Sequence, residues 1–539
     1  NIYGTTTANS GQGAGIWIGS TATNPGDVGS GNLSSGVGTG YTTAIVSDSG
    51  NILLDGRGES TRTDSWQHGW VNIAYGSDKT LIKTVSGNIT GKGDANVLKT
   101  DSSGVQFQVN TTGGAIHLVS TSGDIYLQGF QHSGSTATNN NAMRFTPNAP
   151  SGSIRIGSID DDPSKFTGDI TIEADSIQTL LSFSPPDGAI RLIGAGDLSF
   201  SSTGASSVKD FNLPVTWDFG DAHSSISIGK PTETKTVTLG SAIEAAGPIT
   251  VYGGVINLQN DLTSTLSGSN IRLMARDFIR GDTRAKTIST NGGDVVLAAD
   301  TDGSGSGNIR VFNGLTIDTR VIASGTTKST ALTGGGQVTI GGGNFQGTGF
   351  AIGASSGTAE GIRVDGGFTV RSGGSDINLR GKSWAGSVGS GAGAWGVGVW
   401  DGELVLDSGQ GKVYIEGISQ SSGSGNFKPG VVTNRQVYIH SAYAGADAIR
   451  VIGKSMTTDS SYNHGVDFGG NNDSGTASGY QRIHATGIGG GITIDGYGHE
   501  WAVLLKNNTE LISNGGTINL LGSTGAGSNG AGHYLRNGG

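Results

Sequence analysis

Three stretches in the second half of the chain decide the fold: Asp376-Ile-Asn-Leu-Arg-Gly-Lys-Ser383, Lys412-Val-Tyr-Ile-Glu-Gly-Ile-Ser419 and Ala448-Ile-Arg-Val-Ile-Gly-Lys-Ser455. In each stretch, apolar residues alternate with polar ones and lead to a glycine, and these glycines are 36 residues apart in both steps. Alternation with a period of two predicts a short strand with one buried face. An even repeat of such strands, without helical spacers, predicts one coil of a parallel β-helix per repeat.

The same short unit recurs along most of the chain, for example in Gly114-Ala-Ile-His-Leu118, Gly168-Asp-Ile-Thr-Ile172 and Gly293-Asp-Val-Val-Leu297. The sequence therefore predicts an all-β fold, a parallel β-helix solenoid that is continuous over residues 1–539. Right-handed coils are the common case for this class. At about 4.8 Å per coil, some 18–20 coils would give a rod of roughly 80–100 Å.

Three segments rich in Gly, Ser, Asn and Thr interrupt the pattern, and we expect them to be loops that protrude from the solenoid: residues 10–41, 133–150 and 459–479. The alternation of apolar and polar residues resumes on both sides of each segment. None of the three is therefore interpreted as a linker between domains.

Composition excludes several classes of protein. Glycine supplies 98 of the 539 residues, and each glycine in a helix interior costs roughly 1 kcal/mol relative to alanine, so an α-rich fold is excluded. The net charge of −10, without a basic patch, argues against nucleic-acid binding. The sequence contains no run of 18 apolar residues, so a transmembrane helix is not predicted. The absence of cysteine excludes disulfides and thiolate chemistry, and it is compatible with export.

When the two ends of the chain are joined, their sequence matches the pattern of one strand within a coil. Asn537-Gly-Gly539 followed by Asn1-Ile-Tyr-Gly-Thr5 is similar to the internal stretch Asn514-Gly-Gly-Thr-Ile-Asn-Leu520. One interpretation is that the chain is an internal segment or repeat unit of a larger protein and stacks end to end with copies of itself. The other is an arbitrary boundary within a large protein. Under both interpretations, we expect any export signal to lie outside this sequence.

The repeat style resembles that of filamentous-haemagglutinin-type exoproteins, the giant β-helical adhesins that Gram-negative bacteria secrete with a partner protein. The resemblance is carried by residues 234–258 (TKTVTLGSAIEAAGPITVYGGVINL) and 292–311 (GGDVVLAADTDGSGSGNIRV). It implies an extracellular or cell-surface location and structural or adhesive work without a cofactor. The implied partners are further copies of the chain and glycans on host cells, neighbouring cells or surfaces. The amino-terminal secretion domain of the family has no counterpart here, so the route of secretion stays open.

An enzymatic role is the alternative class, because β-helices also bind or degrade polysaccharides. A glycosidase needs two carboxyl groups about 5–9.5 Å apart across a groove. The densest acidic cluster, Asp160-Asp-Asp162, precedes Pro163 and indicates a turn. The sequence therefore predicts a structural rod that is not an enzyme, with a polysaccharide-binding or polysaccharide-degrading protein as the alternative.

Tryptophans give one candidate binding surface. Trp384, Trp395 and Trp400 lie close in sequence, and exposed rings of this kind can stack on sugars. Alternatively, Trp70, Trp395 and Trp501 share one position at the start of a rung, which favours a structural role at a corner of the core.

Two further motifs have a functional and a plain interpretation. Arg280-Gly281-Asp282 matches the tripeptide that integrins recognise, and the plain interpretation is a chance match in a glycine-rich chain. Asp300 and Asp302 form part of a calcium-loop pattern, but the later acidic positions of that pattern are missing. A turn is therefore the favoured interpretation of these two aspartates, and no metal site is predicted.

Overall fold

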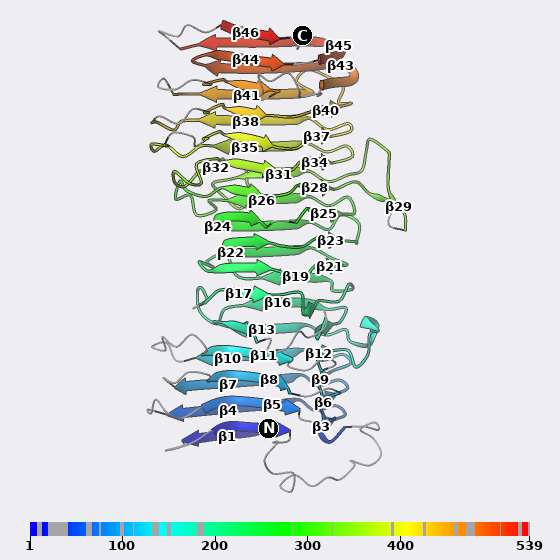
Figure 1. Ribbon diagram of the computed structural model, residues 1–539. Helices are drawn as coiled ribbons and strands as arrows, with labels where there is room; N and C mark the ends of the chain where they lie inside the picture. Colours follow the sequence, from blue (N-terminus) through cyan, green and yellow to red (C-terminus); the bar gives the residue numbers. More distant parts are fainter. Residues whose placement is uncertain are drawn as a thin grey trace. The chain divides into compact units, whose positions relative to one another are not determined.

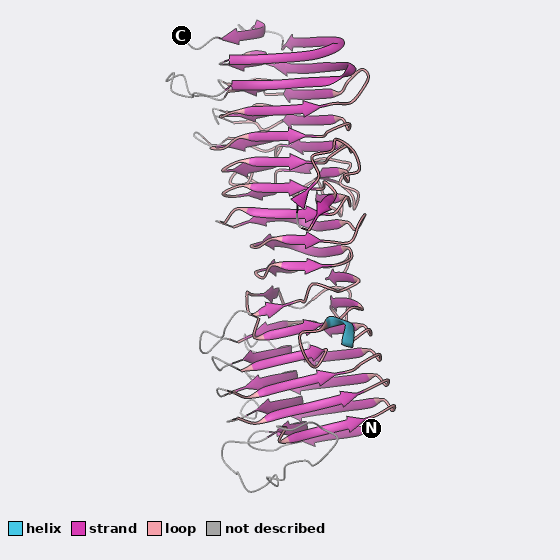
Figure 2. Ribbon diagram, turned by 90° about the vertical axis from the view of Figure 1, so that its right-hand side faces the viewer, coloured by secondary structure: helices cyan, strands magenta, loops and turns pink. Residues whose placement is uncertain are grey.

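The computed structural model describes residues 1–7, 13–19, 41–60, 67–74, 77–97, 102–110, 113–131, 140–147, 152–180, 188–207, 209–282, 284–325, 327–389, 393–423, 427–457, 462–469, 480–506, 508–525 and 531–536. Apart from the short 3-10 helix η1 (Pro163–Lys165), the regular elements of this part are strands. Within each of the two units defined next, the strands lie side by side in stacked coils (Figures 1 and 2). The pairing between successive coils is parallel, so the prediction of an all-β parallel β-helix is confirmed, whereas its handedness stays a prediction.

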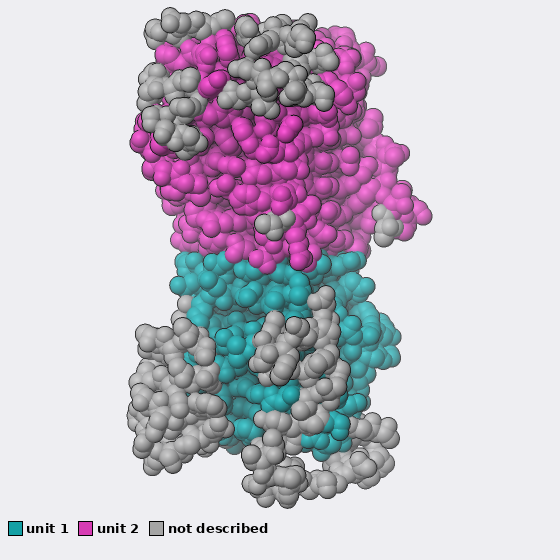
Figure 3. Space-filling view, in the orientation of Figure 1, with its two compact units in different colours: residues 1–253 teal, residues 254–539 magenta. Residues whose placement is uncertain are grey.

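The chain forms two compact units, Asn1–Gly253 and Gly254–Gly539, coloured teal and magenta in Figure 3. Each is described by itself. The prediction of one continuous solenoid over residues 1–539 concerns the way in which these units are joined, and it stays a prediction.

Unit 1 is built from three stacks of parallel strands, so that most coils contribute one strand to each stack. The first stack holds β1 (Ile2–Thr7), β4 (Ile52–Ser60), β7 (Ile89–Val97), β10 (Ile125–Gln131), β13 (Ile170–Ala174), β16 (Asp197–Ser201) and β19 (Ser225–Ile228). The second holds β2 (Gly13–Gly19), β5 (Gln67–Ala74), β8 (Ser103–Val109), β11 (Asn141–Pro147) and β14 (Ile177–Thr179). The third holds β3 (Thr43–Ser47), β6 (Lys79–Thr84), β9 (Ala115–Val119), β12 (Ser153–Gly157), β15 (Ile190–Ile193) and β18 (Trp217–Asp218). The other strands are β17 (Phe211–Leu213), β20 (Thr236–Leu239), β21 (Ile243–Ala245) and β22 (Ile249–Leu258), which runs past the boundary.

Unit 2 repeats the three-stack plan, and its long strands β24 (Ile271–Gly281), β43 (Tyr480–Gly498) and β45 (Asn508–Thr524) each serve two stacks. One stack adds β26 (Val295–Ala299), β31 (Val338–Gly342), β35 (Ile377–Lys382), β38 (Val413–Ser419) and β41 (Ile449–Ser455). Another adds β27 (Ile309–Val311), β33 (Ile362–Asp365), β36 (Val397–Trp400), β39 (Val431–Thr433), β42 (Val466–Phe468), β44 (Trp501–Lys506) and β46 (Ala531–Arg536). The third adds β23 (Leu262–Ser264), β25 (Lys286–Thr290), β28 (Leu315–Asp318), β34 (Phe368–Arg371), β37 (Leu404–Asp407) and β40 (Val437–Ser441). The short β32 (Ala351–Ile352) pairs with β35, and β29 (Ile322–Ser324) pairs with β30 (Thr327–Lys328) in an antiparallel excursion at the right of Figure 1.

The three stretches that decide the fold occupy equivalent positions in neighbouring coils. Gly381 pairs with Gly417, and Gly417 pairs with Gly453, in strands β35, β38 and β41. A Cβ atom on Gly417 would lie 2.1 Å from the carbonyl oxygen of Gly430, so the backbone approaches too closely for any side chain. The repeat of 36 residues seen in the sequence is therefore one coil, and its glycines mark a corner where two segments touch.

Aliphatic ladders fill the interior. In unit 1, one buried position repeats through the first stack as Ile52, Ile89, Ile125, Ile170, Leu198 and Ile226. In-register parallel pairing puts each of these side chains directly over its equivalent in the next coil, where both lose contact with water. The alternation in the sequence is thus the signature of this continuous core.

A row of carboxylate and amide oxygens joins the coils of unit 1 at the turn before the first stack. The Oδ1 atoms of Asn51, Asn88, Asp124 and Asp169 each accept a hydrogen bond from the backbone N–H of the equivalent residue in the next coil, over 2.8 to 3.0 Å. Because these turns lie outside the strand ladder, the side chains supply the acceptors that the turn amides would otherwise lack.

Replacing Asp124 by Ala is therefore expected to reduce the free energy of unfolding of unit 1 by roughly 0.5–1.5 kcal/mol, the usual net value of one hydrogen bond. Asp124→Asn keeps the Oδ1 acceptor, as the amides of Asn51 and Asn88 do, and is the matched control. Chemical denaturation of the three proteins measures the difference. Equal losses for the Ala and Asn variants would contradict the role given to the oxygen.

The structure corrects the three predicted loops. Residues 10–41 contain β2, residues 133–150 contain β11 and residues 459–479 contain β42. All seven residues of β11 and all three of β42 are buried. The apolar alternation is short in these places, for example Met143-Arg-Phe145, and sequence rich in Gly, Ser, Asn and Thr flanks it. The remainder of each predicted loop lies largely outside the described residues.

Candidate functional site

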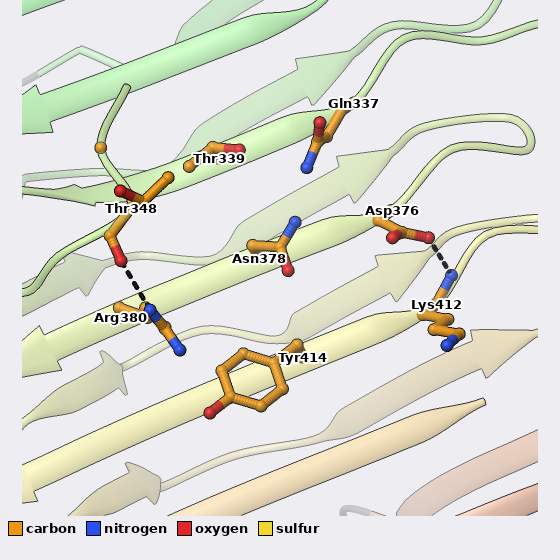
Figure 4. Close-up of a pocket in the computed structure, with 9 residues that line it drawn as sticks. Gln337, Thr339, Thr348, Asp376, Asn378, Arg380, Lys412 and Tyr414 are labelled. Atoms are coloured by element: carbon orange, nitrogen blue, oxygen red, sulfur yellow. Dashed lines mark hydrogen bonds between the residues drawn. The ribbon is translucent and has the colours of Figure 1, made fainter. Parts of the chain in front are cut away.

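An open cavity of about 430 Å³ lies on the outer surface of unit 2, across strands β31, β35 and β38 (Figure 4). We call it the coil groove. Strand alternation explains why its floor is polar: Val413 and Ile415 are buried in the core, and Tyr414 between them faces outward. The lining residues are Gln337, Thr339, Gly347, Thr348, Asp376, Asn378, Arg380, Lys412 and Tyr414.

Three side chains of the coil groove form a row that crosses the strands. Thr339 is in register with Asn378, and Asn378 is in register with Tyr414. Neighbouring strands of a sheet are about 4.8 Å apart, so the row presents one side chain per coil at that interval. Gln337, Asp376 and Lys412 lie two residues earlier on the same coils and form a second row (Figure 4).

Arg380 and Tyr414 are fixed by contacts with the protein. The Nη1 atom of Arg380 donates to the carbonyl oxygen of Thr348 over 2.6 Å, and its guanidinium also pairs with Glu416 at 3.4 Å. This guanidinium lies over the Tyr414 ring, 5.1 Å from its centre. The Tyr414 hydroxyl donates to Glu416 Oε2 over 2.7 Å. Burial and the nearby Glu416 carboxylate raise the pKa of Tyr414, so the phenol stays protonated at neutral pH.

Three polar side chains of the coil groove are free to bind a ligand, whereas Asp376 and Lys412 make contacts with the protein. Within the described part of the chain, the side chains of Gln337, Thr339 and Asn378 have no hydrogen-bond partner. Asp376 Oδ1 accepts from the backbone N–H of Lys412 over 2.8 Å, and the Lys412 ammonium lies 4.7 Å from the centre of the Tyr443 ring. The groove thus combines a rigid tyrosine platform with unpaired amide and hydroxyl groups.

The tryptophans named from the sequence pack into the protein. The side chain of Trp395 is 4% exposed; its ring is nearly parallel to that of Trp400 at 5.7 Å, and Phe427 packs edge-on against it. Trp384 packs on a cluster formed by Ala359, Val388 and Ala394. Trp395 has little ring surface left for a sugar, whereas Trp384 and Trp400 are partly buried. The proposal that Trp384, Trp395 and Trp400 stack on glycans stays a prediction.

The tripeptide Arg280-Gly281-Asp282 lies at the end of β24. Gly281 is buried, whereas Arg280 is exposed and lies over the Phe278 ring at 4.6 Å. Asp282 Oδ1 pairs with the ammonium of Lys286, a side chain that is itself fully buried. The aspartate carboxylate is therefore already engaged by the protein, and recognition of the tripeptide by an integrin stays a prediction.

Asp300 and Asp302 form a hydrogen-bonded turn. Asp300 Oδ1 accepts from the Ser304 hydroxyl and from the backbone N–H of Gly305, both over 2.9 Å. Asp302 pairs with Arg276 at 3.0 Å. Among the described residues, no group of three or more His, Asp or Glu side chains is placed to hold a metal ion.

Unit 2 contains a buried cluster of ionisable side chains that the sequence did not predict. His464 Nδ1 lies 2.8 Å from Asp467 Oδ2, and its Nε2 lies 3.3 Å from Glu500 Oε2. The side chains of His464 and Asp467 are fully buried, and the imidazole packs against the Trp501 ring at 4.8 Å. His464 and Asp467 lie within a segment predicted as loop, and Glu500 is 36 residues away in the next coil. Only the coil register brings them together.

The cluster predicts a pH dependence. Burial alone would lower the pKa of His464, but the Asp467 and Glu500 carboxylates outweigh it and the net pKa is raised above 6.5. The hydrogen bond from His464 lowers the pKa of Glu500 below 4.5. The His464 contribution to stability is thus complete below pH 6.5 and disappears as the pH rises through the folded pKa. The Glu500 contribution is complete above pH 4.5 and disappears as the pH falls through its folded pKa.

Denaturation of the wild type and of Glu500→Gln between pH 3 and pH 9 measures this dependence. We expect the difference in unfolding free energy to be largest between pH 4.5 and 6.5. Its size should be about 0.5–1 kcal/mol, because Glu500 is partly exposed and solvent screens the pair. The variant keeps an oxygen that can accept from the Tyr462 backbone N–H, as Glu500 does. A difference that does not vary with pH would contradict the ion pair.

The described residues contain no helix that is long and apolar enough to cross a membrane. Comparison with known protein families, with curated proteins and with solved structures finds no match for this chain.

Proposed function

We propose that this chain is an extracellular structural scaffold, a segment of a large bacterial adhesin or surface filament. The observation that carries the proposal is the in-register repetition of equivalent side chains from coil to coil. An example in unit 2 is the set Gly381, Gly417 and Gly453, and an example in unit 1 is the aliphatic ladder that runs from Ile52 to Ile226.

Such repetition suits a mechanical role. Paired strands join each coil to its neighbours through backbone hydrogen bonds, and apolar side chains stack on equivalent ones, so the fold can be extended by adding coils. Outward-facing polar positions, such as Tyr126, Thr171 and Ser199 on successive coils of unit 1, give a hydrated surface. The resemblance to filamentous-haemagglutinin-type exoproteins supports the same role and a location on the cell surface.

Negative-stain electron microscopy of the purified chain over a concentration series tests the filament form of the proposal. Filaments that lengthen with concentration and show one regular axial repeat would support end-to-end stacking of copies. Discrete particles of one size at every concentration would contradict self-stacking and would leave an adhesin segment as the form of the scaffold.

A second candidate function is the binding of polysaccharide, which the coil groove favours. Its free hydroxyl and amide groups beside a fixed tyrosine are the kind of surface on which sugars bind. Among the described residues that line the groove, Asp376 is the one carboxylate, whereas hydrolysis of a glycosidic bond ordinarily uses two. We therefore propose binding without cleavage at this site.

A further inference from the structure

We propose that the coil groove binds an uncharged polysaccharide whose chain crosses the strands, with one sugar ring at each of the coils that contribute β31, β35 and β38. This inference rests on the second candidate function, the binding of polysaccharide. It adds the site, the direction of the bound chain and the chemical class of the ligand.

The direction follows from the register of the strands. Thr339, Asn378 and Tyr414 follow one another on adjacent coils, about 4.8 Å apart. In an extended polysaccharide of linked pyranose rings, the length per ring is close to this interval. A chain that crosses the strands therefore meets one outward side chain per ring, whereas a chain parallel to a strand meets side chains of one coil only.

Tyr414 supplies the platform. Its ring is seen nearly face-on in Figure 4, next to the space that the lining residues enclose. The hydrogen bond to Glu416 and the guanidinium of Arg380 hold the ring in place before any ligand arrives. A ring that is already ordered loses little side-chain entropy on binding, so more of the contact energy appears as affinity.

The class of ligand follows from the charges. The guanidinium of Arg380 is paired with Glu416, and the Lys412 ammonium lies against the Tyr443 ring. Asp376 adds a negative charge in the second row, so the groove has no uncompensated block of positive charge for a sulfated or carboxylated chain. Gln337, Thr339 and Asn378 offer neutral donors and acceptors, which match the hydroxyl groups of a neutral sugar.

Isothermal titration of the full chain with neutral oligosaccharides of one to six rings tests the proposal. The probes are β-1,4-linked glucose and mannose oligomers and β-1,3-linked glucose oligomers, with oligogalacturonates and heparin fragments as anionic comparisons. At least one neutral series should bind, with an affinity that increases up to about three rings, one per coil, and little beyond. Its affinity should change little between low and high salt, since no ion pair with the ligand forms.

Two variants locate the site. Tyr414→Ala is expected to weaken binding about 3- to 10-fold, as the loss of one aromatic contact does. Asn378→Ala is expected to weaken it by a similar factor through a lost hydrogen bond. Tyr126→Ala is the matched control, because Tyr126 also lies between two buried strand residues and donates to a glutamate, Glu173, over 2.6 Å, but in unit 1. It should bind as the wild type does.

The outcomes distinguish a failure of the proposed site in the coil groove from a failure of polysaccharide binding itself. If a neutral oligosaccharide binds equally well to the wild type, Tyr414→Ala and Asn378→Ala, the coil groove is not the site, although polysaccharide binding itself stands. If only anionic chains bind, and salt weakens them, the class of ligand is wrong. If no oligosaccharide binds, both the inference and the second candidate function fail.

Discussion

Replacing Phe107 by Ala is expected to reduce the free energy of unfolding of unit 1 by about 3–5 kcal/mol, the range found when a buried aromatic side chain is truncated. Phe107 is fully buried; its ring stacks on Phe145 at 5.3 Å and meets Trp70 edge-on at 5.2 Å. The substitution removes both contacts and leaves a cavity between two coils. Parallel strands hold these coils at a fixed spacing, so the backbone cannot close around the cavity.

Chemical denaturation followed by tryptophan fluorescence measures the loss, since Trp70 lies against the substituted side chain. Phe130→Ala is the matched control, because Phe130 is a half-buried phenylalanine in β10 of the same unit. Its truncation removes less buried surface and should cost less than about 1.5 kcal/mol. Equal losses for the two variants would mean that the packing of Phe107 against Trp70 and Phe145 is not a central part of the core.

Replacing His464 by Leu is expected to cost about 3–5 kcal/mol in unit 2, because it leaves the fully buried carboxylate of Asp467 without its hydrogen-bonded partner. Among the described residues, no group forms a hydrogen bond with Asp467 Oδ1 in the wild type, so the second oxygen depends on the imidazole. The loss should become smaller in acid, where the stranded carboxylate of the variant can be neutralised by a proton.

The double variant His464→Leu/Asp467→Leu separates the two causes of this loss. When both polar partners are removed, no buried charge remains, and at least half of the lost stability should return. Denaturation of the wild type, the single variant and the double variant at pH 6 and pH 8 gives the comparison. A double variant that is no more stable than His464→Leu would show that packing around the imidazole, and not its charge, stabilises the cluster.

Much of the fold could be predicted from local sequence, because one coil of a β-helix repeats a local pattern. The alternation in Asp376–Ser383 and its two counterparts specifies which residues are buried, and the equal spacing of the glycines specifies the register. Strands were missed where few apolar residues alternate and where the surrounding sequence is rich in Gly, Ser, Asn and Thr. In β11 and β42, for example, few alternating residues are available to establish a period.

The candidate sites were harder to predict, because they depend on which coils are neighbours. Equivalent turn residues are 24 residues apart in one pair of coils and 45 in another, so sequence distance does not give spatial distance. The His464 cluster needs the register between coils to place Glu500 beside the imidazole. The coil groove needs, in addition, the segment that holds Thr348 against Arg380. Neither arrangement follows from the residues of a single coil.

Stretching single molecules of the full chain tests whether stacked coils form a mechanical scaffold. We expect a series of unfolding steps at substantial force. Coils of 24 to 45 residues should each release a length of roughly 80 to 150 Å, since an extended residue spans about 3.4 Å. A smooth extension at low force, without discrete steps, would contradict the proposal that this chain acts as a structural scaffold.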